Sequence, residues 1–263
     1  MKIMKKKQHV QLILAIAFHA MNIAEGSNLA NPSITLPEAR IAVGASYHLG
    51  GYSLTNDEIP SLFNRFHGRI EYGIIRYITL GIDLGATQIE VDRYADTIPV
   101  FHGKYGFSGG AHLKLSSPLF AQQKLSLIAI AQATLFNSKN SHSAEYGGKD
   151  GAGIIGIQFH IPGFGFISAG PWVYLIQGEN RDYSGRKRFY SNTDNIRGWF
   201  AIDFFPKTKE ITETKPYATI EVSISPDVTG SRRIPFQALS VSFSIGSISK
   251  RLHGTELEEE WNP

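Results

Sequence analysis

The feature that most constrains this chain is an alternation of apolar and polar side chains that continues through unusually long segments. In residues 69–85, the even positions from Ile70 to Leu84 are large and apolar, with Arg76 as the exception, whereas most odd positions hold charged residues, Thr or Gly. Because successive side chains of a strand point to opposite faces, this pattern predicts two strands with one apolar face each.

The same alternation recurs in ten segments along the chain. Most of these segments run ten to thirteen residues. Strands of globular proteins usually have about five or six residues, whereas a strand that crosses a membrane at a tilt near 45° needs about 9 to 11. The lengths therefore favour membrane-spanning strands. The predicted strands are residues 38–50, 62–74, 78–90, 103–115, 124–137, 150–161, 164–176, 195–205, 216–225 and 236–248.

The connections between the predicted strands alternate in length. The odd-numbered connections are long and polar, as in residues 138–149 and 177–194, whereas two even-numbered ones, residues 75–77 and 162–163, are tight. In an up-and-down barrel these two sets lie at opposite rims, and outer-membrane barrels have long outer loops and short periplasmic turns. The connection 206–215 departs from this pattern, because it belongs to the even set and is long.

Gly, Ser and Thr are frequent on the polar faces of the predicted strands, with charges of both signs at scattered positions. A soluble barrel would instead carry Lys and Glu evenly over its exterior. Small inward residues leave room in a narrow barrel and ease the coiling of its strands. The sequence thus predicts an all-β fold, an up-and-down antiparallel transmembrane β-barrel of ten strands, with eight or twelve strands as open alternatives.

The N-terminus has the three parts of a secretory signal peptide. Four lysines precede an apolar run at residues 10–20, and the small residues Ala24 and Gly26 follow it. The apolar run is too short for a membrane anchor. We expect cleavage near Gly26. The predicted organisation is a signal peptide at 1–26, an N-terminal periplasmic segment at 27–37, the barrel at 38–248 and an acidic tail at 249–263.

Charge and cysteine content exclude several functions. Removing residues 1–26 takes four Lys and one Glu from the 26 basic and 23 acidic residues, which leaves 22 of each. Because the remaining chain has no net charge, the sequence indicates no basic face that would bind nucleic acid. With no Cys, an exported chain has no disulfides and depends on backbone pairing and burial. No ligand spacing indicates a metal ion or another cofactor, and no glycine-rich motif indicates a phosphate loop.

Three sequence features together carry a resemblance: the signal peptide, the stretch EYGIIRYITLGIDLG with its turn, and the last strand ALSVSFSIGSI. The chain resembles small bacterial outer-membrane β-barrel proteins, the class that includes OmpA-like and OmpX-like barrels. The resemblance implies a location in the outer membrane of a Gram-negative bacterium, with outer-membrane lipid, lipopolysaccharide and the barrel-insertion machinery as partners. Such barrels often end at an aromatic residue, whereas this chain continues, so Phe243 is expected to serve that role internally.

An outer-membrane enzyme is one of two functional hypotheses, because some ten-stranded outer-membrane barrels are proteases. Such a site needs Asp and His side chains that converge at the outer rim and activate water. A lipid-modifying enzyme would need Ser and His on the lipid-facing side, but the strand histidines fall on the polar face. None of the protease candidates forms an Asp-x-His pair, so no catalytic residue is assigned. These candidates are Asp92, Asp96, His102, His142, Asp150 and Asp182.

The other hypothesis is a porin-like barrel of structural, adhesive or small-solute passage type, with a plugged or narrow lumen. Basic residues outnumber acidic ones on the predicted inward face, so a pathway through it would prefer anions. Pairing of these charges across the lumen is favoured, because ten strands leave little space. The candidate lumen-lining residues are Arg40, Arg65, Arg69, Glu71, Asp83, Lys104, Lys114, Arg197, Asp203 and Glu221, with Lys124, Trp199 and Tyr217 in the same phase.

The stretch at residues 69–85 also predicts a pairing register. For both strands to keep their even residues outward, the residue numbers of each pair must sum to an even number, so the turn has an odd number of residues. A turn of residues 75–77 then places Arg69 opposite Asp83 inside the lumen. It also places Tyr72 opposite Leu80. The predicted lipid-facing residues are Ile70, Tyr72, Ile78, Leu80 and Ile82.

Overall fold

The fold is taken from a computed structural model, which describes residues 33–55, 59–92, 100–121, 124–206, 214–225 and 239–249. The predicted signal peptide, most of the predicted N-terminal segment and the tail beyond residue 249 lie outside these ranges. Across the described part of the chain, no helix has the length and apolar character that a membrane span requires.

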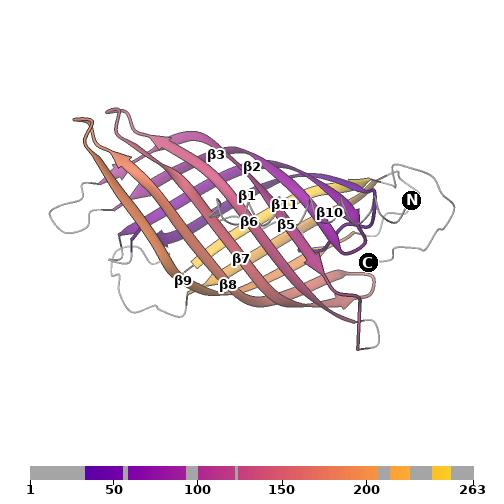
Figure 1. Ribbon diagram of the computed structural model, residues 1–263. Helices are drawn as coiled ribbons and strands as arrows, with labels where there is room; N and C mark the ends of the chain where they lie inside the picture. The colour runs from indigo at the N-terminus through magenta and orange to yellow at the C-terminus, as the bar shows by residue number, and fades with distance from the viewer. Residues whose placement is uncertain are drawn as a thin grey trace, which may run out of the picture.

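The strands of the described ranges form one antiparallel sheet that closes on itself (Figure 1). Apart from the short β4, strands that follow one another in the chain are neighbours in the sheet, and pairing of the first strand with the last closes the barrel. β4 has two residues and pairs with the end of β3, so ten long strands make the wall. The strands are β1 (Ile41–Ser53), β2 (Pro60–Ile75), β3 (Ile78–Val91), β4 (Phe101–His102), β5 (Lys104–Ser116), β6 (Leu125–Lys139), β7 (Glu145–Ile161), β8 (Gly165–Arg181), β9 (Lys187–Phe204), β10 (Thr214–Ile224) and β11 (Leu239–Ser249). The predicted up-and-down barrel of ten strands is confirmed.

The two ends of the barrel differ in their connections. At one end, here called the inner end, β2 and β3 join through residues 76–77, and β7 and β8 join through residues 162–164. At the opposite end, the outer end, the β6–β7 and β8–β9 hairpins reach far out, at the upper left of Figure 1. β7 and β8 have 17 residues each and β9 has 18. These strands are longer than a membrane span needs.

β7, β8 and β9 extend farther toward the outer end than the alternation predicts. The pattern assigns residues 145–149, 177–181 and 187–194 to loops, whereas the structure places them in strands. These residues have no continuous apolar face, so alternation of side chains does not reveal them. Backbone hydrogen bonds between paired strands need no apolar face, and the hairpins therefore continue beyond the apolar part of the barrel.

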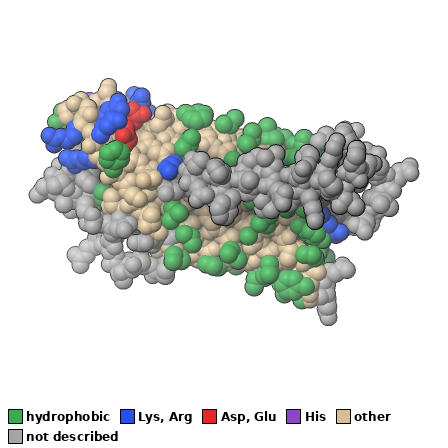
Figure 2. All heavy atoms as spheres, viewed as in Figure 1, with side chains coloured by type: hydrophobic (Ala, Val, Ile, Leu, Met, Phe, Trp, Pro, Cys, Tyr) green, Lys and Arg blue, Asp and Glu red, His purple; other side chains and the backbone are tan. Residues whose placement is uncertain are grey.

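The outside of the barrel carries exposed apolar side chains, which appear as green groups along its length in Figure 2. Ile70 is 51% exposed and Ile82 is 49% exposed. Tyr72 and Leu80 also face outward, as predicted, and Ile78 is half-buried. A protein in water buries most large apolar side chains, whereas a barrel in lipid presents an apolar band on its outside. We call this band the apolar belt.

The β2–β3 hairpin has the predicted register over most of its length. The predicted pairs Arg69–Asp83 and Tyr72–Leu80 are both present. The turn differs from the prediction, because a bulge after Gly73 shifts the register by one residue. The bulge adds one residue to β2, so the turn contains two residues rather than three.

Side chains fill the barrel interior in three zones. Charged side chains occupy the centre, between an apolar cluster at the inner end and an aromatic cluster at the outer end. Because ten strands enclose a narrow space, side chains of this size can fill it. The inner-end cluster consists of Ile34, Leu36, Ala42, Phe166, Phe205, Tyr217 and Ile248. The outer-end cluster includes Tyr52, Phe63, Phe136, Tyr146, Trp172, Tyr174 and Tyr190.

Candidate functional site

The structure places most of the predicted lumen-lining residues inside the barrel. Each of these charged side chains is at most 2% exposed. Trp199 and Tyr217, which share their phase, are buried as well. The predicted charges found inside are Arg65, Arg69, Glu71, Asp83, Lys114, Arg197, Asp203 and Glu221.

Arg40, Lys104 and Lys124 do not join this interior group. Arg40 precedes β1 and is half-buried, and Lys124 is exposed in the β5–β6 connection. Lys104 begins β5 and is exposed, because the pairing of β5 with β6 shifts between Tyr105 and Ser108. A bulge changes the face that the residues beyond it present, so simple alternation assigns Lys104 to the wrong side.

Five side chains in the centre of the barrel form a chain of ion pairs that we call the central network. The Arg69 Nε donates to Asp83 Oδ1 at 2.5 Å, and His112 Nδ1 lies 2.8 Å from Asp83 Oδ2. His112 Nε2 lies 3.1 Å from Glu71 Oε1, and the Lys114 Nζ donates to both Glu71 oxygens at 2.7 and 2.9 Å. The network pairs two carboxylates with two cations through one imidazole.

A glycine makes room for the central network. Gly81 lies between Glu71 and His112 in the pairing of β2, β3 and β5. A side chain at Gly81 would collide with the His112 ring. The missing side chain therefore lets Glu71 and His112 reach each other across β3. The alternation of apolar and polar residues does not reveal this contact.

A second ion pair joins Arg65 of β2 to Asp150 of β7. The Tyr174 hydroxyl donates to Asp150 at 3.4 Å, and the guanidinium of Arg65 lies over the Phe63 and Phe136 rings at 4.7 and 5.1 Å. The sequence places Asp150 at the start of a predicted strand, as a protease candidate at the outer rim. The structure corrects this, because β7 begins five residues earlier and carries Asp150 into the interior.

Arg197 of β9 connects the charged zone to the outer-end cluster. Its Nη2 donates to the carbonyl oxygen of Gly51 at 2.6 Å. Its guanidinium lies 4.5 Å from the centre of the Tyr52 ring and 5.5 Å from that of Trp172. Cation–π contacts strengthen when water is excluded, so the aromatic cluster holds this cation in place.

Residues 33–37 enter the barrel at its inner end, and we call them the inner segment. The Ser33 amide donates to the Asp203 carboxylate at 3.1 and 3.2 Å, and the Ser33 hydroxyl also donates to Asp203. The Thr219 hydroxyl donates to Asp203 at 2.7 Å. The Leu36 amide donates to the Thr79 hydroxyl at 2.6 Å. The bonds to Thr79 and Asp203 tie the inner segment to β3 and β9, and Thr219 of β10 holds the Asp203 carboxylate in place.

The inner segment is a feature that the sequence analysis missed. The pattern assigns residues 27–37 to the periplasm, whereas Ile34 is 3% exposed and Leu36 is fully buried inside the barrel mouth. Both residues belong to the inner-end cluster. The available signal was the alternation of Ile34 and Leu36 with Ser33 and Thr35, which is too short to be distinguished from an irregular segment.

A small cavity lies beside the charged zone. It lies among His48, Trp199 and Glu221, and its volume of about 10 Å³ is room for about one water molecule.

The balance of buried charge differs from the prediction, because Arg40, Lys104 and Lys124 are absent from the interior and Asp150 is present. The buried charges of the described strands are therefore four basic and five acidic residues. The expected preference for anions loses its basis, because it depended on an excess of basic residues.

The enzyme candidates do not assemble into a recognisable site. Asp96 lies outside the described residues, and Asp150 is engaged with Arg65. The Ser184 hydroxyl donates to the Asp182 carboxylate at 2.6 Å and lowers the pKa of Asp182 below its ordinary value, which makes it a weaker base. Among the described residues, no three His, Asp or Glu side chains are grouped to hold a metal ion.

The remaining enzyme candidates lie at the ends of strands or between them, whereas the strand histidines His48 and His67 lie inside the barrel. His102 and His142 are exposed on β4 and in the β6–β7 connection, and Asp92 follows β3. His48 and His67 are buried inside the barrel. This places them away from the lipid-facing side that a lipid-modifying enzyme would use.

Comparison with known proteins gives similarities of strand arrangement alone. No protein-family model and no curated protein matches the chain. An outer-membrane channel from Pseudomonas putida F1 matches with a TM-score of 0.45 and 9% identity, over 85% of this chain and 99% of that chain. The outer-membrane protease OmpT from Escherichia coli matches with a TM-score of 0.35 and 10% identity, over 80% and 93%. A mutant of the monoaromatic hydrocarbon channel TodX matches with a TM-score of 0.33 and 8% identity, over 86% and 93%.

Proposed function

We propose that this protein is an outer-membrane barrel of a Gram-negative bacterium that is closed in its folded state. Its interior is a packed core, so the protein works through its surfaces rather than through flow along its lumen. The apolar belt and the signal-peptide pattern of the N-terminus support the location. The observation that carries the proposal is the central network, whose charged groups are buried and paired with one another.

Three features in series support a closed interior. The inner segment occupies the inner mouth, the central network crosses the middle, and the outer-end cluster fills the outer part. A charge beside an aqueous path keeps its hydration, whereas a buried charge must be neutralised by a partner. A solute would have to break ion pairs such as Arg69–Asp83 and displace packed aromatic rings such as Tyr52 and Tyr174 to pass.

The conductance of the refolded protein in a planar bilayer tests this proposal. We expect small or intermittent current and no steady large steps, because open aqueous lumens are typical of barrels with about 16 to 18 strands. Refolding is verified first by heat-dependent migration on a gel. Large and steady steps from verified monomers, whatever their ion selectivity, would overturn the closed core.

A second candidate is a narrow channel that the inner segment plugs. It is favoured by one observation, that wall side chains such as Thr79 and Asp203 hold this segment by hydrogen bonds. Gly73→Leu tests it, because a side chain at Gly73 would collide with the carbonyl oxygens of Leu36 and Pro37 and displace the segment. Gly68→Leu is the control, since a Cβ there meets only ordinary contacts.

The two candidates differ in the current through the Gly73→Leu variant. Faster removal of residues 33–37 by proteinase K shows that the segment has left the barrel mouth. With the segment displaced, the closed core still gives no steady current, because the central network and the outer-end cluster remain. Steady steps from Gly73→Leu alone, with a silent Gly68→Leu, would establish the plugged channel instead.

The last strand fits the expected partnership with the barrel-insertion machinery. β11 ends the described barrel and pairs with β1, and Phe243 points outward with 45% exposure. An aromatic residue on the outer face of the final strand is the feature expected from the sequence resemblance. We include recognition of β11 by this machinery in the proposal.

A further inference from the structure

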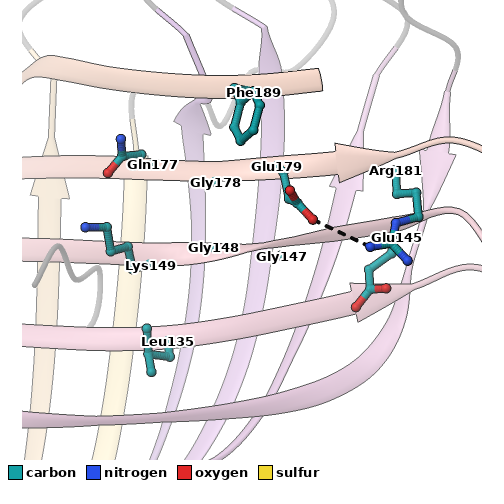
Figure 3. A pocket seen from close by; sticks show the side chains of 10 residues that line it. All are labelled: Leu135, Glu145, Gly147, Gly148, Lys149, Gln177, Gly178, Glu179, Arg181 and Phe189. Carbon is teal, nitrogen blue, oxygen red and sulfur yellow. Dashed lines mark ion pairs between the residues drawn. The ribbon is translucent and has the colours of Figure 1, made fainter. Parts of the chain in front are cut away.

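A groove of about 500 Å³ lies on the outside of the barrel near the outer end, across β6, β7, β8 and β9 (Figure 3). Its wall includes apolar and charged side chains that come from all four strands. Its principal lining residues are Leu135, Gly147, Lys149, Gln177, Glu179 and Phe189.

Strand pairing and a glycine form this groove. Leu135, Lys149 and Gln177 lie side by side in one row across β6, β7 and β8. In the next row toward the outer end, Gly147 pairs with Glu179, and Glu179 pairs with Phe189. A Cβ at Gly147 would meet only ordinary contacts of 3.7 and 3.8 Å, so the space above it is open. The glycine therefore makes the floor of the groove.

The groove lies where the apolar belt ends. On β7 the outward residues toward the inner end are apolar, as at Ile155, which is 72% exposed. On β8, exposed Val173 lies in the belt, and the outward side chains become polar from Gln177 onward. Leu135 is the last large apolar outward residue of β6 and is 59% exposed. In a membrane barrel, the end of the apolar band marks the level at which lipid acyl chains give way to headgroups.

Positive charge predominates around the groove. The rows at this level carry four basic and two acidic outward side chains, which are Lys139, Lys149, Arg181, Lys187, Glu145 and Glu179. Figure 2 shows a charged group at its upper left, where blue side chains predominate. Lys187 lies 3.1 Å and Arg181 3.8 Å from Glu179, so one carboxylate serves both cations. Among the described residues, Lys149 has no carboxylate within ion-pair distance.

We propose that this groove binds the phosphorylated headgroup of one lipopolysaccharide molecule in the outer leaflet. The Lys149 ammonium contacts a phosphate, and Arg181 and Lys187 surround it with further positive charge. The sugar lies over the open floor at Gly147, and the acyl chains descend along Leu135 and the apolar belt. A cation beside an apolar wall matches a ligand with a phosphate above acyl chains.

This inference uses the outer-membrane location of the proposed function, but it does not depend on whether the lumen is closed. Full-length refolded protein in detergent is titrated with diphosphorylated lipid A and with the same lipid after removal of both phosphates. Inorganic phosphate is a third titrant. Binding is followed by native mass spectrometry. We expect the phosphorylated lipid to bind at least about tenfold more tightly than the dephosphorylated one, and free phosphate not to compete at millimolar concentration.

Two pairs of variants locate the site. Lys149→Gln is expected to weaken binding of lipid A by about tenfold, because it removes a charge-assisted hydrogen bond. Lys124→Gln removes the same charge from an exposed residue of the β5–β6 connection at the inner end, and is expected to change binding by less than about twofold. Gly147→Leu fills the groove floor and should abolish specific binding. Gly153→Leu is its control, because a Cβ at Gly153 also projects into open space on the outside of β7.

Equal affinity of the wild type and Lys149→Gln, or equal affinity for the phosphorylated and dephosphorylated lipids, would overturn the inference. If the protein prefers phosphorylated lipid A but conducts steadily in a bilayer, the assignment of the groove stands and only the closed core is rejected. If the protein shows no steady conductance but binds both forms of lipid A equally, only the groove assignment is rejected. Capture of a soluble protein by this face in place of lipid A would also contradict the inference.

Discussion

Replacing Asp83 by alanine is expected to lower the free energy of unfolding by about 3 to 5 kcal/mol. The Asp83 carboxylate accepts from Arg69 at 2.5 Å and lies 2.8 Å from His112, and all three side chains are buried. Removing one partner of a buried ion pair leaves a buried charge without compensation, which costs much more than the pair itself contributes. Urea unfolding in lipid vesicles, followed by tryptophan fluorescence, measures the change.

Two controls accompany the Asp83 variant. The double variant Arg69→Leu with Asp83→Leu removes both charges and should recover most of the lost stability, because apolar pairs replace buried ion pairs well. Glu38→Ala removes an exposed carboxylate near the inner end and is expected to change stability by less than about 0.5 kcal/mol. A loss below about 1 kcal/mol for Asp83→Ala would mean that water reaches the central network.

Placing arginine at Ile82 is expected to cost about 2 to 4 kcal/mol of folding free energy in lipid vesicles. Ile82 is 49% exposed on the outside of β3, midway along the apolar outward residues that begin at Ile78. A charge on the lipid face of a barrel is most costly near the middle of the membrane and costs about 0 to 1 kcal/mol near its surface. Leu135→Arg at the edge of the belt is therefore the matched control.

The same unfolding measurement compares the two arginine variants. A clearly larger loss at Ile82 than at Leu135 supports the assignment of the belt and of its outer edge. Equal and small losses at both positions would place this face in water, and equal large losses would move the edge of the membrane beyond the groove. The second outcome would also weaken the assignment of Lys149 to the headgroup level.

The sequence predicts the wall of the barrel well because the wall is a local property. Alternation assigns Ile70 to the outside and Glu71 to the inside. The requirement that paired residue numbers sum to an even number, together with the position of the turn, predicts the Arg69–Asp83 pair. These predictions need only the two-residue period of a strand and one turn. The same reasoning explains why most predicted interior charges are buried.

The features that the sequence misses depend on partners distant in the chain. Lys104 is misplaced because a bulge in the pairing of β5 with β6 changes the face it presents. Asp150 is predicted at the outer rim, whereas β7 extends beyond it through backbone pairing without an apolar pattern. The inner segment at 33–37 is missed because its burial depends on partners in β3 and β9. The His112 link between Glu71 and Asp83 needs the gap at Gly81.

The most direct test of the closed interior is the reactivity of single cysteines toward a small charged thiol reagent. The natural chain has no Cys, so each variant carries one thiol. Ser244 faces the interior and is 1% exposed, whereas Ser184 is exposed in the β8–β9 turn. In refolded protein in vesicles, we predict complete labelling of Ser184→Cys and no labelling of Ser244→Cys over the same time, with both labelled after unfolding. Labelling of folded Ser244→Cys at the rate of Ser184→Cys would contradict the packed core, because it would show an aqueous path inside the barrel.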